Sequence, residues 1–232
     1  MRGGKNKTGY TITEVLIVLA ISSAMFLVAN SFLSGRVAET SFRTGVNEMA
    51  SRLEDLINQV GSGQYSDLPK GTCSISPVDG KPSLDPNGSV VQGSNNACIF
   101  IGKIITFDSN SYSIELAAGK KNSSSLDDSG AKNIGSIVNY NLPNGLVYVS
   151  KLNIPNKFAF IQNPEGSSLS GDRSAKNILL TDGNFSDSSI AIQDGVYVCL
   201  TNNKRSAKLS IADNNNILSV KKDFYYGSAD CT

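Results

Sequence analysis

The sequence predicts an α+β protein in which one long N-terminal helix packs against an antiparallel β-sheet headgroup. Three observations lead to this prediction. The segment Val15–Leu33 is almost entirely apolar, apolar residues then recur at helical spacing as far as Val60, and short β-type runs separated by turns fill the chain beyond residue 61. A helix and strands that occupy separate parts of a chain are typical of α+β folds.

The apolar segment Val15–Leu33 is long enough to cross a membrane. Its nineteen residues, at about 1.5 Å each, nearly span a bilayer core of about 30 Å. The cations before the segment are Arg2, Lys5 and Lys7. Beyond it, Arg36 and Arg43 are mixed with Glu39 and Glu48. The positive-inside rule therefore places the N-terminus in the cytoplasm and the rest of the chain outside.

The junction between the short basic leader and the apolar segment has a distinctive pattern. Gly9 ends the leader, Tyr10 follows it, and Glu14 is the last charged residue before Arg36. This pattern resembles the processing site of type IV prepilins and of type II secretion pseudopilins. The resemblance covers residues 1–35 and does not extend into the remainder of the chain.

The resemblance implies processing and assembly. It implies cleavage by a prepilin peptidase between Gly9 and Tyr10, methylation of the new Tyr10 amine, and retention of Glu14 in the apolar helix. A carboxylate in hydrocarbon costs about 2.5–3.5 kcal/mol, and pairing Glu14 with the Tyr10 amine of its own or a neighbouring subunit would relieve this cost. The implied partners are the peptidase, other pilin subunits, the inner-membrane assembly platform and, before assembly, membrane lipid.

Two departures from the family pattern refine this expectation. Tyr10 replaces the usual phenylalanine, which keeps an aromatic ring at the first mature position. No proline lies in the middle of the apolar helix, where many major pilins have one that would break the helix. The missing proline and the length of the chain favour a minor pilin or pseudopilin over the main building block.

Three other interpretations of the N-terminal segment compete with this one. An ordinary secretory signal would have an apolar region of about 7–15 residues followed by a small-residue cleavage site, which this segment matches poorly. A permanent anchor would explain Thr11 and Glu14 as a helix capping box. A core helix of a soluble domain is disfavoured because the segment is so continuously apolar.

The predicted organisation has four parts. Residues 1–9 form the leader, 10–35 the transmembrane or filament-core helix, 36–60 an amphipathic helix, and 61–232 a β-rich extracytoplasmic headgroup. The amphipathic part presents one apolar face, made of Phe42, Val46, Met49, Leu53, Leu56, Ile57 and Val60. The run Gly61-Ser62-Gly63 ends the helix.

The headgroup is predicted to contain hairpins. Cys98–Phe107 pairs with Tyr112–Leu116, and Ile137–Tyr140 pairs with Leu146–Val149 across a Leu-Pro-Asn-Gly turn. The later predicted strands are Lys157–Gln162, Ile178–Leu180, Ser189–Gln193, Val196–Thr201, Ser206–Ala212 and Ile217–Lys221. The C-terminal part of the chain is predicted to be a meander.

All four cysteines follow the membrane segment, as expected for an exported, oxidised domain. Four cysteines allow three pairings. Sequence neighbourhood favours Cys73–Cys98 and Cys199–Cys231, with free buried thiols as the alternative. Zinc is disfavoured because the chain lacks histidine and has no closely spaced cysteine pair.

The sequence gives little support for an enzyme, a cofactor or a nucleic-acid partner. It has no histidine, phosphate-binding loop or nucleophile elbow. Without the three leader cations, 18 of the 21 basic residues remain against 20 acidic ones, a net charge of −2. Clustered positive charge, which DNA binding requires, is limited to small groups such as Lys221-Lys222. Acidic turns such as Asp182-Gly183-Asn184 do not fit a calcium loop.

The resulting hypothesis is a structural filament subunit that is stored in the cytoplasmic membrane with a single pass and later enters a cell-surface filament or pseudopilus. The alternative is a permanently anchored receptor or adhesin with a β-rich ligand-binding ectodomain. Cleavage at Gly9–Tyr10 and a requirement for Glu14 in assembly separate the two.

Overall fold

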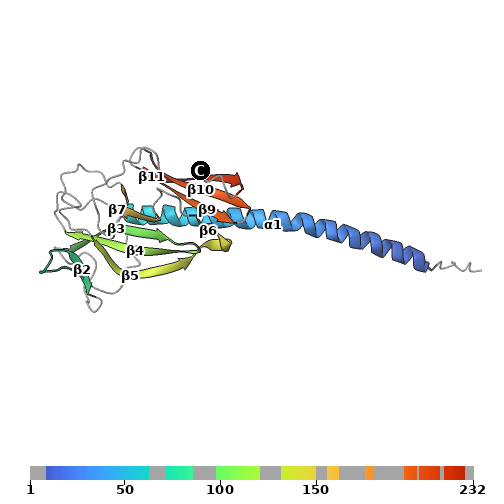
Figure 1. Ribbon diagram of the computed structural model, residues 1–232, viewed down its shortest axis with the longest axis horizontal. Coiled ribbons are helices and arrows are strands. Elements are labelled where there is room, and N and C mark those ends of the chain that lie inside the picture. Colours follow the sequence, from blue (N-terminus) through green and yellow to red (C-terminus); the bar gives the residue numbers. More distant parts are fainter. Residues whose placement is uncertain are drawn as a thin grey trace, which may run out of the picture. The chain divides into compact units, whose positions relative to one another are not determined.

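The computed structural model describes residues 9–62, 72–85, 98–120, 132–149, 156–161, 176–179, 196–202, 204–214 and 217–227. It confirms the α+β class: one long helix, α1 (Ile12–Ser62), is accompanied by antiparallel sheets (Figure 1). The chain divides into two compact units, Met1–Arg43 and Thr44–Thr232. The first unit contains the apolar part of α1, and the second contains its last part together with the strands.

Helix α1 runs without interruption through the Asn30–Gly35 stretch, where polar residues and glycine weaken helix propensity. Thr11 caps its start, and it ends at Ser62, within the predicted Gly61-Ser62-Gly63 stop. The absence of proline between Ile12 and Ser62 leaves the backbone hydrogen-bond ladder intact.

The amphipathic stripe of α1 is buried as predicted. Every residue of the predicted stripe is buried, and Val46, Met49, Leu53 and Val60 are completely inaccessible. In the second unit α1 lies along the strands (Figure 1), and Lys103 of β3 donates a hydrogen bond to Gln59 Oε1 of the helix. Burial of this stripe is the main hydrophobic contribution of the helix to the headgroup.

The sheet beside α1 has the strand order β5-β4-β3-β7-β8 within the described residues. Its strands are β3 (Cys98–Phe107), β4 (Ser111–Lys120), β5 (Lys132–Asn141), β7 (Lys157–Ile161) and β8 (Lys176–Leu179). The β3–β4 hairpin is confirmed, with Phe107 opposite Tyr112. Ile105 and Phe107 are buried on one face, and Ile104 is buried on the other.

A second sheet has the order β11-β10-β9-β6 within the described residues. It contains β6 (Val147–Tyr148), β9 (Val196–Asn202), β10 (Arg205–Asn214) and β11 (Ile217–Tyr226). The three C-terminal strands follow one another as antiparallel neighbours, so the predicted meander is confirmed. Leu209 pairs with Val198 and Ile211 with Val220 on its buried face.

The predicted pairing of Ile137–Tyr140 with Leu146–Val149 is wrong. Strand β5 pairs with β4, whereas β6 pairs with β9 in the other sheet. The 3-10 turn η1 (Pro143–Gly145) between them has Asn144 at φ 53° and Gly145 at φ 68°, and this backbone turns the chain away from β5. Tyr148 N then donates to Ser109 O at 2.8 Å, which fixes the new direction.

A short hairpin, β1 (Thr72–Ile75) with β2 (Pro82–Asp85), was not predicted. Its strands are four residues each, and one begins with proline, which is tolerated at the first position of a strand. The predicted strand Ser189–Gln193 lies outside the described residues.

Candidate functional site

The residues at the predicted processing site lie in an exposed stretch without regular secondary structure, directly before α1. Gly9, Tyr10 and Thr11 precede the first helical turn, and Tyr10 is 88% exposed. A Cβ built on Gly9 would meet nothing within 4 Å. Within the described residues, the peptide bond between Gly9 and Tyr10 is therefore sterically accessible. The rest of the predicted leader, residues 1–8, lies outside the described residues.

Glu14 is held by a capping box in the first turn of α1. Thr11 N donates to Glu14 Oε2 at 2.8 Å, and Glu14 N donates to Thr11 Oγ1 at 3.3 Å. The Thr11 hydroxyl also donates to the same carboxylate oxygen at 2.9 Å. These bonds satisfy backbone N–H groups that a helix start leaves unpaired, and they place a negative charge at the positive end of the helix dipole.

This geometry fixes where the carboxylate lies relative to Tyr10. Thr11 follows Tyr10 directly, so the Glu14 side chain folds back toward the Tyr10 backbone. Both described bonds from Thr11 fall on Oε2 of Glu14. The other oxygen, Oε1, makes no hydrogen bond within the described residues, and it can accept one from a further donor. The structure brings Tyr10 and Glu14 to the same end of α1.

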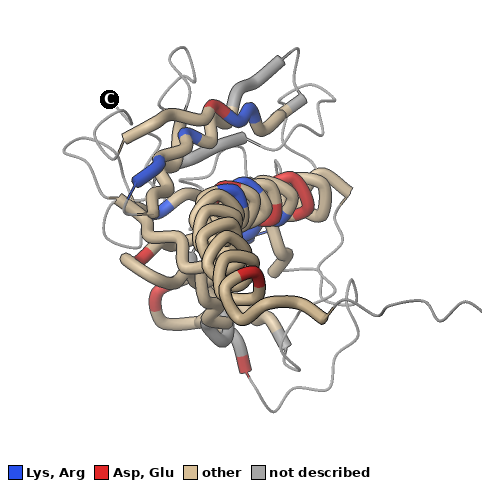
Figure 2. Tube along the Cα trace, turned by 90° about the vertical axis from the view of Figure 1, so that its right-hand side faces the viewer, with Lys and Arg blue, Asp and Glu red and all other residues tan. Residues whose placement is uncertain are grey.

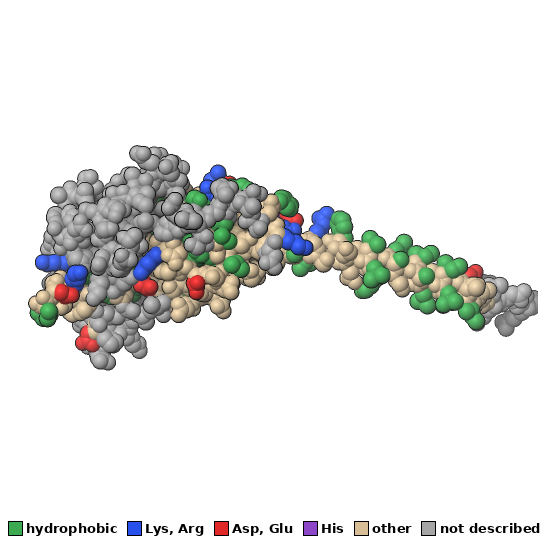
Figure 3. Space-filling model, viewed as in Figure 1, with side chains coloured by type: hydrophobic (Ala, Val, Ile, Leu, Met, Phe, Trp, Pro, Cys, Tyr) green, Lys and Arg blue, Asp and Glu red, His purple; other side chains and the backbone are tan. Residues whose placement is uncertain are grey.

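The apolar part of α1 presents its side chains to the surface. Large apolar residues from Tyr10 to Val37 are exposed by about half or more, among them Leu16, Phe26, Leu27 and Val28. Apolar side chains dominate this stretch on the face seen in Figure 3. The helix is long and apolar enough to cross a membrane. An exposed apolar surface of this size is typical of a segment that lies in lipid or packs against other protein.

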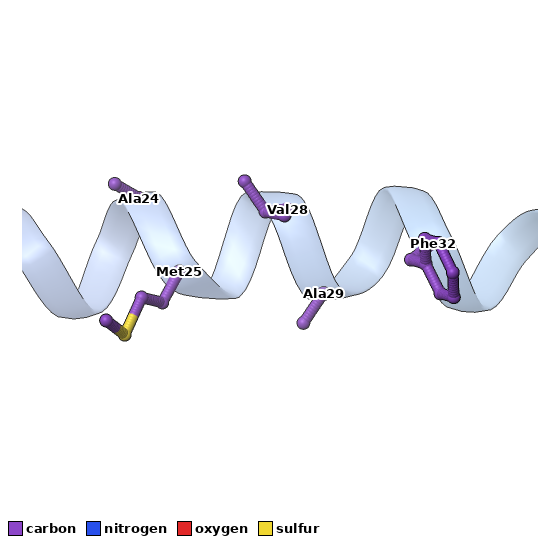
Figure 4. A pocket seen from close by; sticks show the side chains of 5 residues that line it. All are labelled: Ala24, Met25, Val28, Ala29 and Phe32. Carbon is purple, nitrogen blue, oxygen red and sulfur yellow. The ribbon is translucent and has the colours of Figure 1, made fainter.

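A shallow apolar groove occupies one side of this stretch. It is lined by Ala24, Met25, Val28, Ala29 and Phe32, whose side chains follow one another over two turns (Figure 4). In this view Ala24 and Val28 lie along one edge of the helix, Met25 and Ala29 lie along the other, and Phe32 follows at one end. Such a surface accepts a ridge of apolar side chains from another helix.

The predicted Cys73–Cys98 disulfide is confirmed. It joins β1 to the start of β3, with the two Cα atoms 5.7 Å apart. Both cysteines are buried in a small apolar cluster with Leu116, Ala118 and Ile134. Cys199, on β9, is also disulfide-bonded. Its expected partner, Cys231, lies outside the described residues.

Apart from Glu14, the charged residues of the described part of the chain lie beyond the apolar segment, from Arg36 onward. Basic and acidic residues both occur on α1 and on the strands (Figure 2). Among the described residues, no group of three or more metal-binding side chains occurs. Two ordered contacts on the headgroup are the ion pair Lys221–Asp223 at 3.4 Å and Lys208 over the Tyr197 ring at 4.0 Å. These are ordinary surface contacts on β-strands.

Two structurally important residues were not singled out by the sequence. Gly45 lies under the η1 turn, where a Cβ would come within 3.1 Å of both Leu146 Cδ1 and the Pro143 carbonyl oxygen. Lys103 is only 2% exposed although it carries an amine. A glycine in a helix and a lysine in a strand are unremarkable in sequence, and only the tertiary contacts reveal their roles.

Comparison with family models, curated proteins and solved structures finds no match to this chain. Its function is therefore inferred from the geometry and the sequence pattern at the start of α1.

Proposed function

We propose that this chain is a structural subunit of a type IV pilus or a related pseudopilus. Prepilin peptidase cleaves it between Gly9 and Tyr10, and the apolar half of α1 holds it in the cytoplasmic membrane with residues 1–9 inside and the headgroup outside. Assembly then moves this half from lipid into contact with the helices of other subunits. No reaction is catalysed by the chain itself.

The observation that carries the proposal is the position of Glu14. It is the one acid between Gly9 and Arg36, and it lies in the first turn of a helix whose following surface is exposed and apolar. A carboxylate at that place costs about 2.5–3.5 kcal/mol in hydrocarbon, so a compensating cation is expected. Cleavage after Gly9 creates such a cation, the Tyr10 amine, one residue before the cap.

Two features support a minor subunit over a major pilin: the apolar helix has no proline at its middle, and the chain is longer than many major pilins. An uninterrupted α1 keeps all its backbone hydrogen bonds within the helix, which suits residence in a bilayer. The headgroup, with its disulfide, is suited to an oxidising compartment outside the membrane.

A permanently anchored receptor or adhesin is the second candidate. The observation that favours it is the capping box, because the bonds between Thr11 and Glu14 are complete without any cleavage. Under this alternative Glu14 only starts the helix, and another capping arrangement could replace it.

Replacement of Glu14 separates the two functions. In cells that assemble the filament, Glu14→Ala is expected to remain in the membrane and to be absent from sheared filaments, whereas wild-type subunits are incorporated. Glu39→Ala is the matched control, because Glu39 also lies on α1 but beyond the apolar segment and bonds Arg43 at 3.0 Å. If Glu14→Ala subunits enter filaments at the wild-type level, the pilin mechanism is wrong.

A further inference from the structure

Large apolar side chains are exposed at only a few places among the described residues of the second unit. Val78, at the turn of the β1–β2 hairpin, is 93% exposed. Val138 and Tyr140, on strand β5, are 40% and 37% exposed. The fourth such residue, Tyr226, lies in the other sheet. The hairpin and strand β5 belong to the same end-to-end arrangement of strands and can be compared directly.

The turn of the β1–β2 hairpin presents an apolar tip with one charge of each sign. We call residues 77–81 the hairpin tip; all five are exposed, and their sequence is Pro-Val-Asp-Gly-Lys. Two backbone hydrogen bonds close the turn: Ser76 N donates to Lys81 O at 2.9 Å, and Gly80 N donates to Ser76 O at 3.0 Å. The hairpin is also tied to β3 by the disulfide. A tip held in this way loses little conformational freedom when it binds.

The exposed end of β5 forms a second surface, with an aromatic ring beside charges of both signs. Val138 and Tyr140 are two residues apart in a strand, so they lie on one face of it. The ring of Tyr140 stacks on that of Tyr112 at 5.2 Å. Burial raises the pKa of Tyr112, and the nearby charges of Arg52 and Glu48 on α1 also affect it. Both charged residues are exposed. We call Val138, Tyr140, Glu48 and Arg52 the β5 patch.

The hairpin tip and the β5 patch lie at opposite ends of the strands. The disulfide joins the hairpin to Cys98, which pairs with Lys120 at the end of β4. Tyr140 pairs with Tyr112, near the start of β4. Eight residues of β4 separate these two places, which is about 26 Å. Figure 1 likewise shows β2 at one end and β6, which follows the turn after β5, at the other. The two surfaces therefore cannot meet within one chain.

We propose that the hairpin tip of one copy packs on the β5 patch of a second copy that has the same orientation, with Val78 against Val138 and Tyr140. The inference rests on the proposed function, because a head-to-tail contact between identical chains repeats along a filament. The occupant of the β5 patch is thus the hairpin of a second copy. The contact involves the second unit alone, and the apolar half of α1 takes no part in it.

Charge complementarity favours a second copy as the partner. The hairpin tip carries Asp79 and Lys81, and the β5 patch carries Arg52 and Glu48. Neither charged residue of the patch makes an ion pair with a described residue. Pairing of Lys81 with Glu48, and of Asp79 with Arg52, places opposite charges around the apolar contact. Each surface thus supplies both the apolar and the charged partners that the other requires.

The contact is small and acts together with the packing of the helices. Five residues at a hairpin tip bury too little surface for a stable complex in isolation. In a filament, the helices hold neighbouring copies close to one another, so the hairpin tip meets the β5 patch at a high effective concentration. The contact then fixes which ends of neighbouring headgroups meet.

Cysteine crosslinking tests the contact. Filaments of a Val78→Cys/Tyr140→Cys variant, treated with a mild thiol oxidant, are expected to give covalent dimers, extended to a ladder of multimers where copies follow one another. The matched control is Val78→Cys/Ser219→Cys, because Ser219 is exposed on β11 in the other sheet and should give no covalent dimers. Both variants are read on non-reducing gels.

Charge reversal tests the complementarity. In the Val78→Cys/Tyr140→Cys chain, Lys81→Glu is expected to lower the yield of covalent dimers by about fivefold or more, with cleavage at Gly9–Tyr10 unchanged. Adding Glu48→Lys should restore the yield to within about twofold, because the pair is then reversed. An unchanged yield with Lys81→Glu, or no restoration by the second change, overturns the inference.

The crosslinking results also separate this inference from the proposed function. Absence of covalent dimers, or equal yields from the two cysteine variants, in filaments of processed subunits overturns the inference and assigns the hairpin tip to a different protein. The proposed function survives that result. It fails if wild-type chains are neither cleaved nor incorporated.

Discussion

Gly45 allows the η1 turn to approach helix α1. A methyl group at this residue would lie closest to a leucine side chain and a backbone carbonyl, and the backbone cannot move without disturbing the turn. The turn itself sends the chain from one sheet into the other. Glycine at this position lowers the helix propensity of α1 but allows the turn to pack closely on the helix. The packing involves residues that are distant in the sequence.

Substitution of Gly45 tests this contact. Gly45→Ala is expected to lower the free energy of unfolding by about 1–3 kcal/mol, because the added methyl group overpacks the site. The measurement is urea unfolding of the full chain in detergent. Gly61→Ala is the control, since a Cβ there meets nothing within 4 Å and alanine is the better helix former. Equal effects of the two substitutions would contradict this explanation of Gly45.

Tyr112 gives the headgroup a sensitivity to high pH. Burial raises the pKa of its phenol, with a smaller opposing effect from Arg52 and smaller supporting effects from Tyr140 and Glu48. Because the folded state holds the proton more tightly, stability is unaffected below the pKa of the unfolded chain, about 10, and falls as pH rises through the folded pKa. The wild type should lose more unfolding free energy than Tyr112→Phe between about pH 8 and pH 11. Equal losses would show that Tyr112 does not contribute.

At the scale of elements, the sequence correctly predicted the features that depend on residues close together in the chain. The stripe from Phe42 to Val60 and the β3–β4 hairpin depend on periodicity and on a short turn, and both are confirmed. The partner of β6 depends on β9, about fifty residues away, so no local signal indicates it. The β1–β2 hairpin escaped prediction because four-residue strands carry too few residues to establish a period of two.

The Cys73–Cys98 disulfide stabilises the element that the sequence did not predict. It ties the β1–β2 hairpin to the start of β3 across a sequence separation of 25 residues. Replacing both cysteines by alanine is expected to lower the free energy of unfolding by about 2–4 kcal/mol, chiefly because the unfolded chain gains freedom. Thermal unfolding with and without reductant checks this. An unchanged midpoint in both conditions would mean that the link carries no stability.

At the scale of the whole molecule, the two units of the chain have different surfaces. The first presents an apolar surface with one acid at its start, and the second buries its core between helix and sheet. The candidate site could be predicted from sequence because Gly9, Tyr10 and Glu14 are close together in the chain. The Thr11–Glu14 capping box, which the sequence also indicated, sets the direction of the Glu14 side chain.

The most direct test of processing and assembly as a filament subunit is the intact mass and N-terminal peptide of the protein extracted from its native membrane without reductant. The expected result is that residues 1–9 are absent, that Tyr10 is N-methylated, and that the four cysteines have lost four hydrogens. A chain that retains Met1, or one cut beyond Leu33, would contradict the proposed function and would indicate a permanent anchor or an ordinary secreted protein.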